Sequence, residues 1–220
     1  MKRLRLLLLA SGRGSHVVNL VAATRGGRID GVVTRVVCDR PEAPVLGKAQ
    51  ALDVPTTLLE PVAPGARLPE AAEEQLLGIA RADEAGLIAL CGFMRLLSAE
   101  VLERLALPVL NVHPSLLPSF RGLHAQRQAI EAGVRVTGVT VHFVDSGMDT
   151  GPILLQAALP IHPDETEESL SQRLLPLEHR LYAEAVRLYA MGAVRREGRR
   201  VTIRPGAVSD WLAPGAEGGN

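Results

Sequence analysis

The strongest constraint on the fold is the way the chain begins. Residues 4–10 read Leu-Arg-Leu-Leu-Leu-Leu-Ala, an apolar run with a single charge and no alternation. A strand that is apolar on both faces is typical of the centre of a parallel sheet covered by helices. The run passes directly into Ser11-Gly12-Arg13-Gly14, and residues 17–24 read as a helix. Strand, glycine turn and helix together predict an α/β fold with a doubly wound, mostly parallel, Rossmann-like sheet and helices on both faces.

The rest of the chain continues this alternation. Further strands are expected over residues 31–38, 56–59, 87–91, 108–110, 137–144 and 153–161, with helices over 46–52, 70–82, 98–105, 125–132 and 165–189 and a basic hairpin over 192–204. The length of 220 residues suits one large α/β domain better than the alternative of two small ones. We therefore expect a single domain over residues 1–205 and a C-terminal tail over 206–220 that is partly mobile.

Composition excludes some classes of function. Lys plus Arg and Asp plus Glu each number 24, so the net charge is zero. A nucleic-acid binder that works by bulk charge is not expected, although a local basic pocket stays open. Cys38 and Cys91 close two apolar runs and are interpreted as buried thiols in a reducing compartment. No signal-peptide cleavage pattern follows the first apolar run, and no run is long enough to span a membrane, so a cytoplasmic location is expected.

The glycine turn after the first strand predicts an anion site. Free N–H groups and the positive dipole end of the next helix would face an anion there, and glycines allow close approach of a phosphate. The third glycine of the dinucleotide fingerprint is replaced by Val17, and the Lys of a Walker loop is absent. An ordinary tight turn stays open as the alternative. Asp39, at the end of the second strand, is read as a turn acid rather than a ribose-binding acid.

A polar pair at the end of a short buried strand is the main candidate for chemistry. Residues 108–110 predict that strand, which is expected to stop at Asn111 and His113. Open α/β sheets place their ligands at the carboxyl ends of strands. Asn offers an amide donor, His offers a proton near neutral pH, and Asp149 from another loop can orient the His or pass protons. The alternative is that the pair is a turn and its cap.

Two further features have competing interpretations. Residues 93–97 form an unusually apolar loop, either a wall for a flat ligand or packing beneath the helix that Ser98 caps. His142 falls on the polar side of the strand predicted over 137–144, where a supporting role is favoured over a direct one.

Several ordered motifs resemble the folate-dependent formyltransferases, and the resemblance covers nearly the whole chain. The matching motifs are Ser11-Gly12-Arg13-Gly14-Ser15, Gly92-Phe93-Met94-Arg95-Leu96-Leu97, Asn111-Val112-His113-Pro114-Ser115-Leu116-Leu117-Pro118, Gly122-Leu123-His124-Ala125, Gly138-Val139-Thr140-Val141-His142, Asp149-Thr150-Gly151-Pro152-Ile153 and Glu178-His179. One departure is His16, where the family usually has Asn. Because a phosphate would use the backbone N–H there, the departure affects only a side-chain contact.

The resemblance implies transfer of a formyl group from 10-formyltetrahydrofolate, as co-substrate, to the amine of glycinamide ribonucleotide, without a metal. Attack of an amine on a formamide carbonyl builds an oxyanion that needs fixed donors. Asn111 and protonated His113 would supply these donors. Asp149 would favour the cationic imidazole and help move the proton from the amine to the leaving nitrogen.

The same resemblance implies the remaining contacts. The phosphate would contact Gly14, Ser15 and His16, and the ribose would contact Glu178. The residues that would contact the folate are Met94, Arg95, Leu96, Leu97, Asp145, Asp149 and Arg67. His124 and His142 would support the site. The N-terminal half would bind phosphate and the C-terminal half would bind folate and carry the chemistry. The partners are then small molecules, without nucleic acid or membrane, and the protein a monomer or homodimer.

Four alternatives compete with this interpretation. Methionyl-tRNA formyltransferases share the Asn–His–Asp set but carry an additional C-terminal domain, and formyltetrahydrofolate hydrolases normally carry an N-terminal regulatory domain, neither of which is expected here. A nucleotide-binding oxidoreductase is disfavoured by the missing third glycine. A phosphate-ligand sensor is disfavoured by the retained Asn111, His113 and Asp149.

Overall fold

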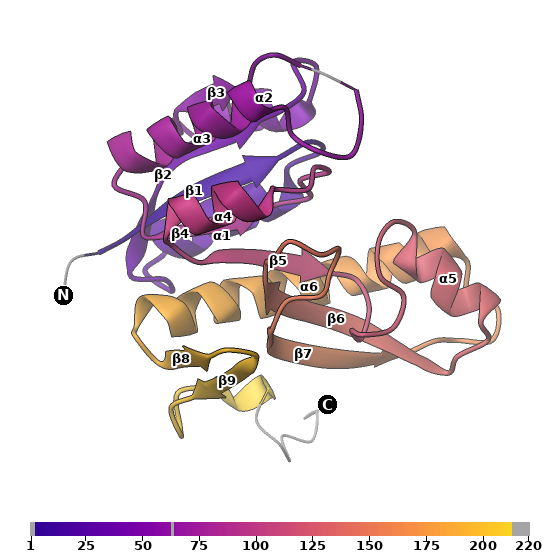
Figure 1. Cartoon of the computed structure of the whole chain (residues 1–220). Coiled ribbons are helices and arrows are strands. Elements are labelled where there is room, and N and C mark those ends of the chain that lie inside the picture. Colours follow the sequence, from indigo (N-terminus) through magenta and orange to yellow (C-terminus); the bar gives the residue numbers. More distant parts are fainter. Residues whose placement is uncertain (1–2, 63, 213–220) are drawn as a thin grey trace. The chain divides into compact units, whose positions relative to one another are not determined.

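A computed structural model describes residues 3–62 and 64–212 of the chain (Figure 1). The described residues fall into two compact units. The first unit comprises the residues up to Val112 together with Phe143–Gly151, and the second comprises His113–His142 together with the residues from Pro152 onwards. Each unit is described by itself.

The sheet of the first unit is parallel. Its strands are β1 (Leu4–Ala10), β2 (Gly31–Cys38), β3 (Thr56–Leu58), β4 (Leu87–Leu90) and β5 (Val109–His113), in the order β3-β2-β1-β4-β5. The chain moves outward from β1 in one direction and then returns to β4 on the other side of it. The strand order therefore reverses between β1 and β4, where doubly wound folds open a crevice for ligands. This confirms the predicted α/β fold with a mostly parallel sheet.

Helices explain why β1 is apolar without alternation. The first unit holds α1 (Ser15–Arg25), α2 (Pro44–Ala51), α3 (Glu70–Ala82) and α4 (Ala99–Leu105). Leu7 and Leu9 pack into a core cluster with the apolar sides of α3 and α4. Leu6 and Leu8 point to the opposite face of the strand, because successive side chains alternate, and they are equally buried. Both faces of the central strand are thus covered.

The second unit is antiparallel in its strands. It holds α5 (Ala125–Glu131), the pair β6 (Val136–Phe143) and β7 (Ile153–Pro160), the long helix α6 (Glu167–Ala190), the hairpin β8 (Val194–Glu197) and β9 (Arg200–Ile203), and a short 3-10 helix, η1 (Asp210–Leu212). The helix α6 packs against β7 and α5. Thr166 caps α6: its hydroxyl accepts from the backbone N–H of Ser169, and the Ser169 hydroxyl accepts from the N–H of Thr166.

The structure refines two predictions about strands. The strand predicted over residues 108–110, and expected to stop at Asn111 and His113, includes both of these residues, because Asn111 still pairs with Leu90 in the ladder to β4. Pro114 is the first residue that cannot extend it. The predicted polar side of the strand around His142 is buried, since every residue from Thr137 to Phe143 is buried.

A buried carboxylate holds the C-terminal segment of the second unit. Glu184 in α6 is fully buried and accepts hydrogen bonds from Arg187 and from both the N–H and the hydroxyl of Ser209, at 2.7–2.8 Å. Burial alone would raise the pKa of Glu184, but the hydrogen bonds from Arg187 and Ser209 outweigh it and hold the pKa below its usual value. Ser209 belongs to the tail predicted over residues 206–220, of which 213–220 lie outside the described residues.

Cys38 and Cys91 are free and buried, as predicted. Burial raises the pKa of both thiols.

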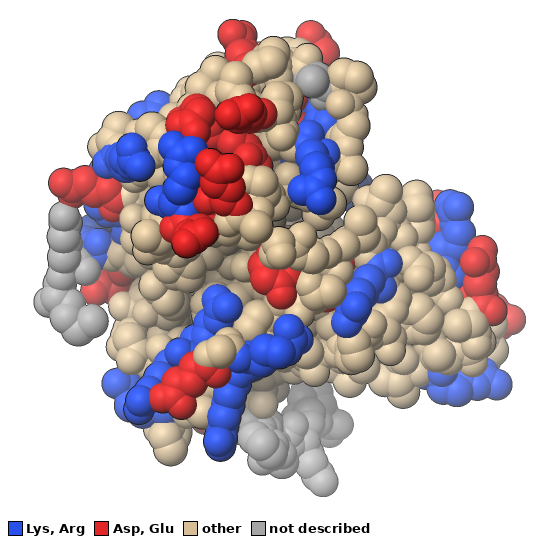
Figure 2. Space-filling view, viewed as in Figure 1, with Lys and Arg blue, Asp and Glu red and all other residues tan. Residues whose placement is uncertain are grey.

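Charges of both signs are interspersed on the face drawn in Figure 2. None of the helices in the described part of the chain has the length and apolar character needed to cross a membrane.

Candidate active site

The predicted anion loop ends in a glycine that no other residue can replace without strain. Gly14 is the N-cap of α1 and has a left-handed backbone, with φ of 76°. A Cβ at this position would lie 2.6 Å from Cγ2 of Val45 in α2. The first N–H groups of a helix have no partner within it, and its dipole favours an anion at this end. Ser15 and His16 begin the helix, and the side chain of His16 is buried.

A lysine beside this loop was not anticipated from the sequence. The ammonium group of Lys48, in α2, donates to the backbone carbonyl of Arg13 at 2.8 Å. Lys48 is one of two lysines in the chain. It lies 35 positions from the loop, so no spacing rule could indicate the contact. The loop therefore has a positive charge next to it as well as a helix N-terminus.

The 93–97 loop after β4 is fastened to the end of β1. The N–H of Met94 donates to the hydroxyl of Ser11 at 2.9 Å, and the Met94 side chain is 52% exposed. Leu97 is buried in the core. Arg67 forms a parallel bridge with Leu96, which brings the predicted folate contacts of two loops side by side.

The guanidinium of Arg95 is turned inward. Its Nε donates to Oδ2 of Asp39 at 2.7 Å, and both side chains are more than 90% buried. Asp39 is therefore a buried ion-pair partner, a role that neither the turn nor the ribose interpretation described.

Asn111 and Asp149 meet within the first unit. The amide of Asn111 donates to Oδ1 of Asp149 at 3.4 Å, a long hydrogen bond. Asp149 has a left-handed backbone with φ of 51°, which is uncommon outside glycine and is found at functional sites. Asn111 and His113 are two positions apart on β5, so their side chains leave the same face of the strand.

The loop that carries Asp149 is closed by its own contacts. Oδ1 of Asp145 accepts from the N–H of Gly147 at 3.1 Å and from the hydroxyl of Thr150 at 2.5 Å. A Cβ on Gly151 would lie 1.7 Å from the carbonyl oxygen of Phe143, so only glycine fits there. In these contacts the Asp145 carboxylate orders the loop backbone around Asp149.

His113 is buried, and the contact of one ring nitrogen shows that this nitrogen carries a proton. Nε2 lies 2.8 Å from the carbonyl oxygen of Phe120. A carbonyl oxygen only accepts, so the contact requires the proton on Nε2. Nδ1 is the ring nitrogen that this contact does not use.

The remaining candidates in the second unit differ in their surroundings. His142 is buried in β6. The His124 side chain is largely exposed, with Nδ1 3.2 Å from a carboxylate oxygen of Glu167. Glu178 is half-buried in α6, two residues after a proline inside that helix. His124 therefore forms a surface pair, whereas His142 lies in the interior of its unit.

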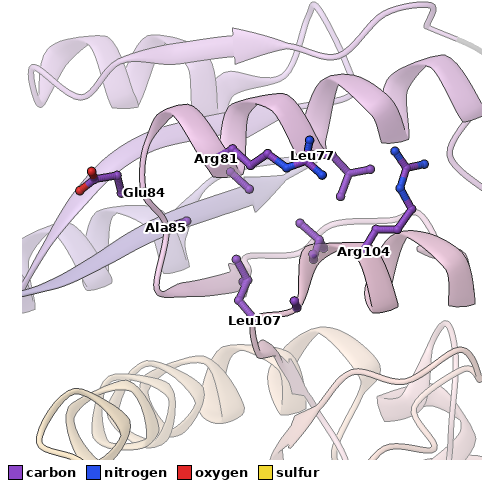
Figure 3. Close-up of a pocket in the computed structure, with 9 residues that line it drawn as sticks. Leu77, Arg81, Glu84, Ala85, Arg104 and Leu107 are labelled. Atoms are coloured by element: carbon purple, nitrogen blue, oxygen red, sulfur yellow. The ribbon is translucent and has the colours of Figure 1, made fainter.

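A cavity of about 250 Å³ in the first unit lies away from these residues. Figure 3 shows Arg81, Glu84 and Arg104 around it. Its lining precedes β4 and β5 in the chain, so it lies at the amino ends of the strands, whereas ligands of doubly wound folds bind at the carboxyl ends. Across residues 3–62 and 64–212, no cluster of three or more His, Cys, Asp or Glu side chains is arranged to hold a metal ion.

The family follows from sequence comparison. The sequence model of the family described as formyl transferase matches residues 4–186. The chain belongs to the formyl transferase family. The resemblance seen in the motifs is thereby confirmed.

Members of the formyl transferase family with closely similar sequences act in purine metabolism. The phosphoribosylglycinamide formyltransferase of Bacillus subtilis is 39% identical over 82% of this chain and 91% of its own length. The trifunctional purine biosynthetic protein adenosine-3 of Drosophila melanogaster is 39% identical over 87% of this chain, which spans 14% of that protein. The crystal structure of glycinamide ribonucleotide transformylase 1 from Symbiobacterium toebii has a TM-score of 0.85 and 43% identity, covering 92% of this chain and 94% of that one.

Proposed function

We propose that this chain transfers the formyl group of 10-formyltetrahydrofolate to the amino group of glycinamide ribonucleotide. The products are formylglycinamide ribonucleotide and tetrahydrofolate, in purine biosynthesis. The observation that carries the proposal is the Asn111–Asp149 contact near the carboxyl end of β5, in a member of the formyl transferase family. The names of the relatives support the choice of acceptor.

Asn111 and His113 stabilise the oxyanion in this proposal. The amine nitrogen attacks the formyl carbon, and negative charge develops on the formyl oxygen. The amide of Asn111 is one donor. Protonated His113 is the second donor, and its contact with the carbonyl of Phe120 supports a fixed orientation of the ring.

Asp149 moves the proton. As the bond from the formyl carbon to N10 of the folate breaks, the attacking nitrogen loses a proton and N10 gains one. A carboxylate that passes this proton to N10, directly or through a water, allows N10 to leave as a neutral amine rather than as an anion. The hydrogen bond from Asn111 and the closed loop around Asp149 support a fixed position for that carboxylate.

The ribonucleotide binds through its phosphate and ribose. The N–H groups of Gly14, Ser15 and His16 receive the phosphate at the start of α1, with the positive charge of Lys48 beside them. The exposed position of Lys48 and its contact with Arg13 support this assignment. Glu178 binds the ribose hydroxyls.

The folate lies against residues of three loops in the first unit. Met94, Arg95, Leu96 and Leu97 form one wall, Asp145 and Asp149 another, and Arg67 meets the glutamate. His124 and His142 have supporting roles in this proposal. We further propose one domain over residues 1–205, a cytoplasmic protein that is a monomer or homodimer, and no nucleic-acid or membrane partner.

A spectrophotometric assay with a 10-formyl folate analogue tests the proposal. Deformylation that requires glycinamide ribonucleotide is the expected result. Deformylation at the same rate without the ribonucleotide would instead assign a hydrolase that uses water as acceptor. If neither mixture reacts while both compounds bind, the chain is a binding protein that retains the site, and the proposal is wrong.

A further inference from the structure

A buried ion pair connects the 93–97 loop to a strand that carries no candidate site residue. Asp39 follows β2, and Arg95 lies 56 positions later, after β4. The side chains of Asp39 and Arg95 are 5% and 8% exposed, respectively. Removing two charges from water is costly, so such a pair is weak evidence for stability alone and calls for another role.

The Arg95 guanidinium joins three segments of the first unit. Nε donates to Asp39, while Nη1 donates to the carbonyl of Gly65 in the loop before α3. That loop is also joined to the 93–97 loop by its backbone, since Leu96 donates to Ala66 at 2.7 Å and accepts from the N–H of Leu68 at 3.3 Å. The guanidinium therefore fixes the distance between the Arg67 loop and the 93–97 loop.

Asp39 contributes only one of its two carboxylate oxygens to this arrangement. Oδ2 accepts from Arg95, whereas Oδ1 is buried without a hydrogen-bond partner. An arginine usually binds a carboxylate with two parallel hydrogen bonds. Here the guanidinium donates to both Asp39 and Gly65, so two segments hold it in place. Oδ1 of Asp39 is left without a hydrogen-bond partner as a result.

We propose that Asp39 is a positioning residue for folate binding. By holding the Arg95 guanidinium, Asp39 sets the backbone of the 93–97 loop and the spacing of that loop from Arg67. The inference rests on the proposed function, because it takes these two loops as the folate wall. Asp39 itself does not touch the folate.

The test measures the KM of each substrate separately in Asp39→Asn, which keeps the shape of the side chain and removes its charge. The expected result is a rise in the KM for the 10-formyl folate analogue on the order of tenfold, the effect of losing about one hydrogen bond between the displaced 93–97 loop and the folate. The KM for glycinamide ribonucleotide and kcat change less than twofold. Direct calorimetric titration of each ligand gives the same split without turnover.

The matched control is Asp83→Asn. Asp83 is the buried partner of Arg35 in the same unit, at 2.9 Å, and its pair contains no residue of either loop. A general loss of stability would change both variants alike, so the folate-specific change is expected in Asp39→Asn alone.

A second variant, Arg95→Lys, keeps the charge on Asp39 but cannot reach Gly65 at the same time. We expect a folate KM between those of the wild type and Asp39→Asn, so Arg95→Lys decides the question if Asp39→Asn does not fold. An unchanged folate KM, or equal rises in both KM values, overturns the positioning role. Failure of the wild type to transfer formyl at all is a separate result that rejects the proposed function instead.

Discussion

A histidine whose Nε2 donates to a backbone carbonyl can change its charge only at the other ring nitrogen. In His113 that nitrogen is Nδ1, because Phe120 requires the proton on Nε2. In the proposed mechanism the protonated ring would provide both the charge and a hydrogen bond that an oxyanion needs, on the same strand face as Asn111.

Loss of either proposed catalytic side chain should lower kcat strongly while the protein stays folded. We expect His113→Ala to lower kcat by about 10² to 10³, the loss typical of one oxyanion donor. We expect Asp149→Asn to lower kcat by about 10² to 10⁴, the contribution of a general acid–base group. Asparagine tolerates the left-handed backbone of Asp149, so its strain is not altered. Steady-state kinetics measures both losses.

The control for Asp149→Asn is Asp53→Asn. Asp53 also has a left-handed backbone, with φ of 48°, and is exposed in the same unit. It should retain wild-type kcat and melting temperature. Wild-type turnover in either His113→Ala or Asp149→Asn contradicts the mechanism.

Single residues were predictable where their position in the chain reveals their surroundings. Asn111 and His113 stand out because polar side chains end an apolar strand, and the family motifs supply Asp149. The Asp39–Arg95 pair was missed because its members are distant in sequence and each alone is an ordinary loop residue. Lys48 was missed for the same reason, since only the packing of α2 against α1 brings it to Arg13.

At the scale of elements, the start of α1 depends on the packing of α2. Gly14→Ala places a Cβ 2.6 Å from Cγ2 of Val45 and forces an L-residue into a left-handed backbone. We expect Gly14→Ala to raise the KM for glycinamide ribonucleotide about tenfold or more, because a displaced helix start loses a charge-assisted hydrogen bond to the phosphate. The folate KM should change less than twofold. Steady-state kinetics with each substrate varied checks this.

The double variant Gly14→Ala/Val45→Ala separates the two causes. It removes the contact with Cγ2 at 2.6 Å but keeps the contact with Cβ at 2.8 Å and the backbone strain, so it should recover only part of the lost ribonucleotide affinity. Equal losses of affinity for both substrates would argue against a phosphate at the start of α1.

Elements with strong periodicity were predicted well, and their ends and faces less so. The expected bounds of β1 and α3 agree with the structure, because an unbroken apolar run and an amphipathic helix need no tertiary information. The strand β5 is longer than expected because the ladder to β4 supports Asn111. The alternation around His142 indicated a polar side of the strand but not its exposure, because burial on both faces of β6 is a tertiary effect.

At the scale of the whole molecule, buried carboxylates make the free energy of unfolding depend on pH. The hydrogen bond from Arg35 holds the pKa of Asp83 below its usual value, and the pKa of Glu184 is also lowered. A lowered folded-state pKa adds stability above the unfolded-state pKa, near 4, and this stability is lost as the pH falls through the folded-state value. Unfolding should therefore become easier only below about pH 4.5.

Glu184→Gln tests this for one group. Removing a charge from a buried pair should lower the free energy of unfolding by about 3 kcal/mol at pH 7. The difference from the wild type should shrink as the pH falls toward 3, because wild-type Glu184 then becomes protonated as well. Urea denaturation at pH 7, 5, 4 and 3 measures it.

The control for Glu184→Gln is Glu197→Gln. Glu197 pairs with Arg195 on the exposed hairpin, and its loss should change the free energy of unfolding by less than about 0.5 kcal/mol at every pH. A Glu184→Gln difference that stays constant from pH 7 to 3 would show that Glu184 is not charged in the folded protein.

The two cysteines have a practical consequence for spectroscopy. Both thiols are buried, and burial raises their pKa, so little reactive thiolate is present near neutral pH. A maleimide dye should therefore leave the native protein unlabelled, and Met94→Cys would introduce one reactive position on an exposed side chain of the 93–97 loop. Mass spectrometry should find one dye per chain, and its fluorescence would then follow folate binding in real time.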